Sequence, residues 1–136
     1  MDERLAELTI GMARAQRAIR ESVLAAGRSL GVRFPDDYVD FMVQSNGAEG
    51  SVGKNAYLAL WRVEELVPLN DSYHVEEFAP ELVLFGSDGG GMAYAFDRNL
   101  ERPRIVEVPF IDMGIEDPTP CGYSLTEFLE RLWSRQ

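Results

Sequence analysis

The stretch LVLFGSDGGGMAYAFD, residues 82–97, decides the fold that this sequence predicts. Leu82 to Phe85 is a short continuous apolar run, which is typical of a strand that is covered on both faces. Gly86 to Gly91 favours backbone angles that only glycine adopts freely, and it predicts a turn or bulge. Met92 to Phe96 is again a run of strand formers, so the stretch predicts a β-hairpin.

Further strands are expected on both sides of this hairpin. Tyr57 to Trp61 is a short apolar run with aromatic ends, and Ile105 to Phe110 alternates apolar and polar residues. Pro109 near the end of the second run favours an edge strand. Val63 to Tyr73 contains a helical turn that Pro68 is expected to interrupt. Asp112 to Gly122 is rich in acids, glycine and proline and predicts a loop.

Three amphipathic segments predict helices. Apolar residues recur at spacings of three and four from Leu5 to Leu30, with Gly31 as a stop and Gly11 as a weak point. Pro35 begins a second helix that Asn46-Gly47 ends. Ser124, with Glu127 three residues on, forms a capping box that opens the last helix.

Together these elements predict an α+β fold, in which a single domain has an antiparallel β-sheet flanked by helices, in the order helix, helix, strands, helix. Residues 1–14 are expected to form an N-terminal helical extension or a frayed segment, and residues 15–134 the domain itself. Tyr38 and Phe128 are expected in the core. Trp61 and Trp133 are expected to be core or half-buried packing residues, or interface anchors if exposed.

The charge of the chain limits the classes of molecule that it is expected to bind. The 136 residues carry a net charge of −10. Residues 1–34 hold six arginines against four acids, whereas residues 35–136 hold seven basic against nineteen acidic residues, a net charge of −12. This acidic body repels nucleic acid and anionic membranes and attracts a basic partner. Solubility alone explains a charge of this size equally well.

The sequence also predicts a location for the protein. Cys121 is the only cysteine, which fits a reducing cytosol and a cytoplasmic protein. The longest stretch without a charged residue, Pro118 to Thr126, is far shorter than the roughly 20 apolar residues of a membrane span. The N-terminus has no unbroken apolar region and is not a secretory signal.

Candidate catalytic and ligand sites are few. Cys121 and His74 could form a nucleophile and base, but the Cys121 loop has no cysteine-enzyme signature. The glycine loop lacks the lysine of a phosphate-binding loop. Asp112, Glu116 and Asp117 do not follow a calcium-loop pattern, and no zinc ligand set is present. We therefore expect no enzyme activity, no metal and no cofactor.

A resemblance extends over roughly residues 15–134. The residues that carry it are Leu30 to Tyr38, Phe41, Asn46-Gly47, Trp61, Val63 to Leu66, Asn70, Phe85 to Gly91, Tyr94 to Asp97 and Ser124 to Trp133. In this order they resemble segments of the SUKH superfamily, in its cell-wall-assembly-regulator (Smi/Knr) branch. Leu125 stands where the family commonly has an aromatic residue.

The resemblance implies a compact, non-catalytic α+β binding domain. In bacteria many such proteins are immunity proteins that bind and neutralise toxins, often nucleases or deaminases, so the partner would be a cognate toxin or another basic protein. Alternatively, the domain would be a regulatory or scaffold module that binds a host protein or a small ligand in a groove between sheet and helices. The predicted partner-binding residues are Asp71, Glu76, Glu77, Asp88, Asp112, Glu116 and Asp117.

Overall fold

A computed structural model describes residues 2–14, 17–99, 101–115 and 117–136. Its helices are α1 (Glu3–Leu8), α2 (Arg20–Leu30), α3 (Asp36–Ser45), α4 (Val63–Ser72), α5 (Val75–Phe78) and α6 (Leu125–Trp133). Its strands are β1 (Met12–Arg14), β2 (Ala48–Val52), β3 (Ala56–Leu60), β4 (Leu82–Ser87), β5 (Met92–Asp97), β6 (Arg104–Pro109) and β7 (Thr119–Gly122).

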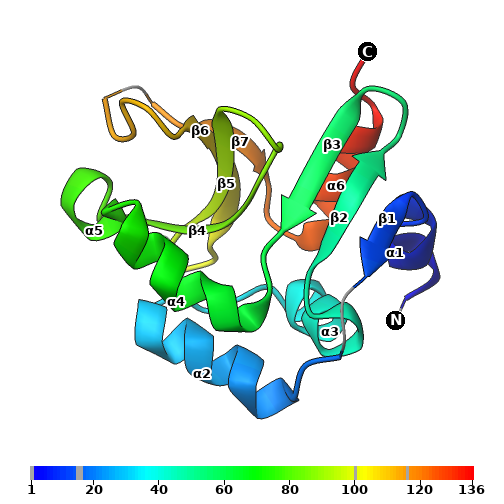
Figure 1. The fold of residues 1–136 in the computed structure, drawn as a ribbon, viewed down its shortest axis with the longest axis horizontal. Coiled ribbons are helices and arrows are strands. Elements are labelled where there is room, and N and C mark those ends of the chain that lie inside the picture. Colours follow the sequence, from blue (N-terminus) through cyan, green and yellow to red (C-terminus); the bar gives the residue numbers. More distant parts are fainter. Residues whose placement is uncertain (1, 15–16, 100, 116) are drawn as a thin grey trace.

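The seven strands form one antiparallel sheet in which each strand pairs with the next in sequence. This confirms the predicted α+β class with an antiparallel sheet. The order of elements is more mixed than expected, because β1 precedes α2, and α4 and α5 come between β3 and β4. Figure 1 shows α2 and α3 beneath the sheet and α1 with β1 at its right-hand end.

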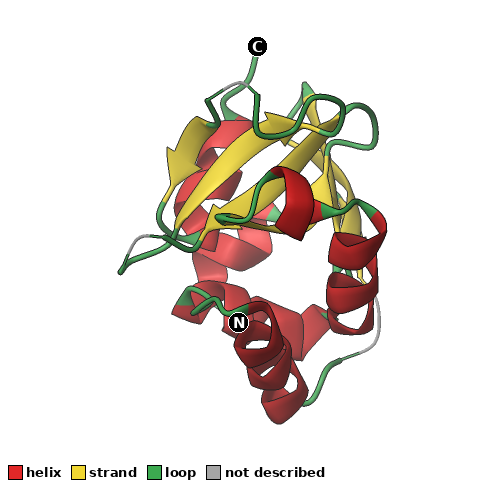
Figure 2. Ribbon diagram, turned by 90° about the vertical axis from the view of Figure 1, so that its left-hand side faces the viewer, coloured by secondary structure: helices red, strands yellow, loops and turns green. Residues whose placement is uncertain are grey.

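The central strands are buried on both faces, as the apolar run of β4 predicts. Val83 and Phe85 of β4 belong to the larger core cluster, which α1, α3 and α6 complete. Leu82 and Leu84 belong to a smaller cluster on the opposite face, which includes Val75 of α5. In Figure 2, α5 accordingly lies in front of the sheet and α6 behind it.

The hairpin between β4 and β5 forms as predicted. The register shifts between Leu84 and Gly86, and Gly89 has a φ of +80° in the turn. The Asp88 carboxylate accepts hydrogen bonds from the backbone N–H groups of Gly90 (2.8 Å) and Met92 (3.2 Å). These bonds fix the turn, because a short acceptor side chain satisfies the N–H groups that the strand ladder does not.

The sheet is interrupted between β3 and β4. These strands share only the pairs Ala59–Ser87 and Leu60–Gly86. Where β3 departs, the side chain of Asn70 in α4 takes its place: the side chain donates to Leu84 O (2.9 Å) and accepts from Leu84 N–H (2.9 Å). A buried backbone pair that lacked both bonds would lose several kcal/mol, on the order of 1–3 for each group.

The N-terminal segment differs from the amphipathic helix predicted from Leu5 to Leu30 with a weak point at Gly11. The helix ends after Leu8, β1 pairs with β2, and a new helix begins at Arg20. A Cβ at Gly11 would lie 2.7 Å from the carbonyl oxygen of Ser51, so only glycine lets the chain approach β2 this closely. Backbone pairing with β2 therefore outweighs the helical periodicity.

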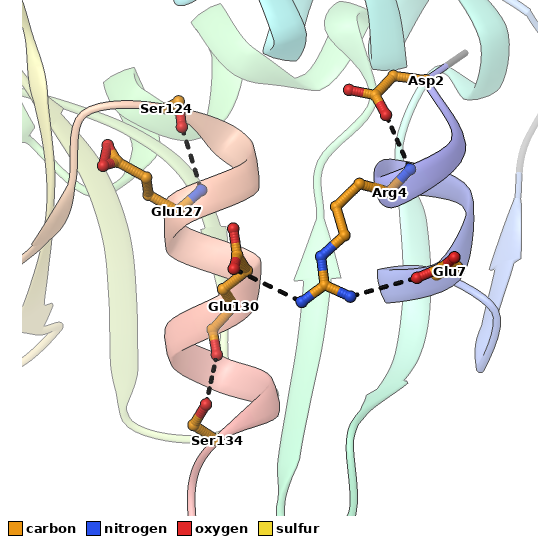
Figure 3. A network of polar contacts seen from close by, with 7 residues as sticks. All are labelled: Asp2, Arg4, Glu7, Ser124, Glu127, Glu130 and Ser134. Atoms are coloured by element: carbon orange, nitrogen blue, oxygen red, sulfur yellow. Dashed lines mark hydrogen bonds and ion pairs between the residues drawn. The ribbon is translucent and has the colours of Figure 1, made fainter.

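Helix α1 docks on α6 through apolar and polar contacts. Leu5 and Leu8 are buried in the larger core cluster, and each contributes about 1.5–3 kcal/mol of burial. Arg4 forms ion pairs with Glu7 (3.2 Å) and with Glu130 of α6 (3.5 Å), as Figure 3 shows. Both ion pairs are exposed, so the two leucines provide most of the stabilisation.

The predicted helices that begin at Pro35 and Ser124 are confirmed. Asn46 ends α3 with a φ of +42°. The Ser124 side chain accepts a hydrogen bond from Glu127 N–H at 3.1 Å, as Figure 3 also shows. As expected, Tyr38 and Phe128 are fully buried and Trp61 is half-buried; Trp133 is exposed.

Further expectations about the strands and α4 were wrong, and one strand was not predicted. Strand β6 is not an edge strand, because β7 pairs along its other side. Strand β7 was expected to be part of a loop, because Thr119–Gly122 contains proline and glycine, which are uncommon in strands. Strand β2 has no counterpart among the strands that the sequence predicts. Helix α4 continues through Pro68, although proline has no N–H to donate to the carbonyl of Glu64. Leu66 before the proline and Asn70 after it are both buried.

Candidate functional site

The corner between α4 and α5 is acidic and hollowed. His74 connects the two helices in a left-handed conformation, with a φ of +54°, which turns the chain sharply after α4. Asp71, His74, Glu76 and Glu77 line a surface hollow of about 360 Å³ together with Asn70. Three of the predicted partner-binding acids are therefore neighbours in one hollow.

The loop of residues 110–115 packs against this corner. Met113 is buried in the same cluster as Val75 and Ala79. A Cβ at Gly114 would lie 2.1 Å from the carbonyl oxygen of Phe78, so the backbone of the loop touches the end of α5 directly. Asp112 of this loop is exposed, and Asp117 follows it, also exposed.

Aromatic rings join the corner to the loop. Trp61 stacks on Tyr73 with ring centroids 6.2 Å apart, and Tyr73 packs on Phe110 at 4.7 Å. Trp61 and Phe110 pack against the smaller core cluster, whose members include the fully buried Ala93 and Ala95. These alanines leave room above β5, and the rings can therefore lie close to the sheet.

We call Asp71, Glu76, Glu77, Asp112 and Asp117 the acidic face. The fold brings the segments that carry these residues, α4–α5 and the loop after β6, to the same side of the sheet (Figure 1), although they are distant in sequence. Residues 63–97 and 105–130 include no lysine or arginine but fourteen acids. Arginines from elsewhere in the chain pair with five of the fourteen, but within the described residues none of the acidic face forms a salt bridge. Unpaired exposed acids of this kind attract and orient positively charged molecules.

Arg98 borders the acidic face but is bound elsewhere. It lines an adjoining hollow together with Asp71 and Glu76. Its guanidinium donates hydrogen bonds to the carbonyl oxygens of Leu30 (2.7 Å) and Pro80 (2.9 Å). These bonds hold the arginine against the backbone, so its role is to join α2 to the segment before β4.

Asp88 and Glu116 complete the predicted set. Asp88 is half-buried, and one of its oxygens is occupied in the β4–β5 turn. The turn borders the loop, because Phe110 N–H donates to Gly91 O at 2.9 Å. Asp88 therefore lies beside the acidic face in a structural role. Glu116 lies outside the described residues.

The lone thiol and the lone imidazole occupy different environments. Cys121 is buried in the larger core cluster, and burial raises the pKa of its thiol; Arg131 and Arg135 partly oppose this shift. The thiol donates to Thr119 O at 3.4 Å. His74 is exposed, and its ring contacts Phe78. Within the described ranges no contact joins the two side chains, so they do not form a nucleophile–base pair.

The described residues offer little sign of a metal site or a membrane-spanning segment. Within the part of the chain that the structure describes, no three His, Cys, Asp or Glu side chains converge as metal ligands. No helix in those ranges has the length and apolar character that a bilayer crossing requires. A hollow of about 610 Å³ lies between α2 and α3. Another, of about 650 Å³, lies between the start of α3, residues 101–103 and the start of α6, and both are lined by Arg33 and Phe34.

The polar residues that carry the family resemblance have structural partners. Asn46 accepts from Val63 N–H at 2.8 Å and thereby caps α4. Asp37 accepts from Leu125 N–H and Thr126 N–H at the start of α6. Asn70 fills the gap between β3 and β4. These residues build the scaffold, and the acidic face is displayed on it.

The sequence analysis missed the apolar side chains beside the acidic face. Phe78, Ile111 and Ile115 are exposed, the two isoleucines almost completely. The sequence contains a signal for this surface, because the two isoleucines stand in an acidic, proline-containing segment. A loop that only faces water is expected to be polar there.

The fold agrees with the comparison to known protein families. No curated protein matches the chain. The model of the SMI1 / KNR4 family (SUKH-1) matches residues 20–131, from α2 into α6, and α1 and β1 lie ahead of the match. Because the match covers most of the chain, this protein belongs to the SMI1 / KNR4 family (SUKH-1).

Proposed function

We propose that the protein is a non-catalytic, immunity-type binding protein that neutralises a basic protein toxin by docking it on the acidic face. The observation that carries this proposal is the convergence of two acidic segments on one side of the fold, with no lysine or arginine in residues 63–97 or 105–130. The separate environments of Cys121 and His74 support a binding role.

The electrostatic argument concerns the rate of association. A toxin that acts on nucleic acid carries a basic groove for its substrate. The acidic face would be attracted to such a groove, and complementary charge raises association rates above the roughly 10⁵–10⁶ M⁻¹s⁻¹ of uncharged pairs. Exposed carboxylates contribute little to stability, so they can be changed without unfolding the protein.

The first test uses the proteins encoded by the genes that flank the gene for this chain. One of them should arrest growth when it is expressed alone in a bacterial host, and co-expression of this protein should restore growth. The purified pair should bind, and association should slow steeply between about 0.05 and 0.5 M salt. If neither flanking product is toxic, or if this protein does not relieve the arrest, the immunity role is wrong and the regulatory alternative takes its place.

The second test compares matched charge reversals. Glu76→Lys/Glu77→Lys should slow association at low salt by about tenfold and leave the dissociation rate nearly unchanged. Glu3→Lys/Glu101→Lys makes the same change in charge at exposed residues outside the hollow and should have little effect. Equal association rates for both variants would show that the acidic face does not steer the partner.

A further inference from the structure

The loop of residues 110–115 is anchored at its centre and displays isoleucines on either side. Met113 is only 6% exposed, and the backbone of Gly114 contacts Phe78. Ile111 and Ile115 are 79% and 78% exposed. A hydrogen bond of 3.1 Å from Ile115 N–H to Asp112 O closes the turn. The two isoleucines are thus held outward by a fixed backbone.

The backbone of this loop turns sharply at Asp112. Asp112 has a φ of +65°, in the left-handed region that aspartate adopts more readily than most residues other than glycine. Met113 and Gly114 follow directly and hold the turn against α5. The position of the loop is therefore defined by packing, and the two isoleucines on either side of it are exposed.

Neighbouring apolar side chains extend the surface. Phe78, at the end of α5, is 55% exposed, and Tyr73, which packs on Phe110 beside the loop, is 41% exposed. We call Tyr73, Phe78, Ile111 and Ile115 the apolar patch. Each large apolar side chain gains about 1.5–3 kcal/mol when it is fully buried. The folded chain recovers little of this for the two isoleucines and about half of it for Tyr73 and Phe78, so the rest is available to a partner.

Charge identifies the occupant. Acids of the acidic face flank the patch residues along the chain: Asp71 precedes Tyr73, Glu76 and Glu77 precede Phe78, Asp112 lies between the two isoleucines and Asp117 follows Ile115. Asp71, Glu76 and Glu77 also share one hollow. A second copy of this chain would bring the same acids against them, and like charges in close contact cost several kcal/mol. A partner with an apolar surface that is surrounded by lysine or arginine would be complementary both to the apolar patch and to the acids near it.

We infer that the apolar patch is the anchoring centre of the docking surface and receives apolar side chains of a protein partner whose rim is basic. This inference rests on the proposed function and deepens it by separating two roles. The acidic face sets the association rate. The apolar patch holds the bound partner and therefore sets the dissociation rate, because a few buried apolar side chains carry most of the energy of an interface.

Two synthetic peptides test the inference while the partner is unidentified. Both are amphipathic helices of about 15 residues with equal lysine content; one has leucine on its second face and the other has serine. Each is titrated into isotopically labelled protein, and amide chemical shifts report the site. The leucine peptide should shift the amides of residues 73–78 and 111–115 and bind at least about tenfold more tightly than the serine peptide.

Matched variants assign this difference to the patch. Ile111→Ser/Ile115→Ser should remove the advantage of the leucine peptide and leave the serine peptide unaffected. Ile10→Ser/Ile19→Ser changes two isoleucines that are equally exposed, at 79% and 74%, in the basic N-terminal part of the chain. This control should keep the full advantage.

The outcomes separate the inference from the proposed function. If both peptides bind the acidic face equally well, or if the control loses as much as the patch variant, the apolar anchor is wrong and attraction by the acidic face stands. If neither peptide shifts residues 73–78 and 111–115, the acidic face loses its support as well. Self-association that Ile111→Ser/Ile115→Ser abolishes would overturn the inference in favour of a second copy.

Discussion

At the scale of single residues, the core is aromatic and contains one costly hydroxyl. The Tyr38 ring packs against Phe34, Phe85 and Phe96 with centroids 4.8 to 5.7 Å apart. Its hydroxyl is buried and has no hydrogen-bond partner among the described residues. Burial holds the pKa of Tyr38 well above its ordinary value of 10.0. The ring stabilises the fold, and the hydroxyl opposes it.

Tyr38→Phe should therefore stabilise the protein. At neutral pH we expect a gain of about 1–3 kcal/mol in the free energy of unfolding, because the variant buries no unpaired hydroxyl. The gain should grow above about pH 10, since the unfolded tyrosine releases its proton there while the folded one retains it. Urea unfolding at pH 7 and about pH 11 measures both effects.

Tyr73→Phe is the control for this experiment, because Tyr73 is exposed and its change should be close to neutral at both pH values. A variant Tyr38→Phe that is less stable than the parent at pH 7 would show that the hydroxyl has a stabilising partner.

At the scale of elements, polar side chains connect helices and strands that are far apart in sequence. Asp37, in the first turn of α3, lies where a carboxylate interacts favourably with the positive end of the helix dipole. It also accepts hydrogen bonds from Leu125 N–H (2.9 Å), Thr126 N–H (2.8 Å) and the Thr126 hydroxyl (2.8 Å) at the start of α6. Asp36, its exposed neighbour, has no such contact among the described residues.

The pair Asp36 and Asp37 allows a matched comparison. Asp37→Ala should lower the free energy of unfolding by about 1.5–3 kcal/mol, because it removes charge-assisted bonds from the N-terminus of α6. Asp36→Ala should change it by less than about 0.5 kcal/mol. Urea unfolding at neutral pH checks both values, and equal effects would mean that Asp37 acts only through the dipole of α3.

At the scale of the whole molecule, the net charge of −10 arises from the acids of residues 35–136. Self-repulsion of this kind opposes the compact state and is screened by salt. The midpoint of urea unfolding should therefore rise as NaCl increases from about 0.05 to 0.5 M. Glu76→Lys/Glu77→Lys changes the net charge from −10 to −6, since each reversal adds two, and should reduce this dependence. A midpoint that falls with salt, or one equally sensitive in the variant, would contradict the argument.

Prediction from sequence worked best for features that neighbouring residues control. The turn after Phe85, the left-handed ends at Gly31 and Asn46, and the Ser124 cap of α6 appear as expected. The second half of the predicted capping box differs, because the Glu127 carboxylate accepts from Tyr123 N–H instead of Ser124 N–H. Asp71, Glu76 and Glu77, which the sequence analysis names as partner-binding residues, line one hollow because α4 and α5 are adjacent in the chain. Their role as a binding site stays a prediction.

The sequence by itself thus determined the fold class, the buried hairpin, the main caps and an acidic surface, since each depends on interactions within a few residues or on composition. Only the tertiary structure decided that residues 12–14 and 119–122 are strands, that Asn70 replaces a missing strand, and that the isoleucine loop packs on α5 beside the acids. The physical reason is that these features arise where backbone groups or surfaces distant in sequence meet. Unpaired N–H and C=O groups must then find partners, and local composition does not specify which ones.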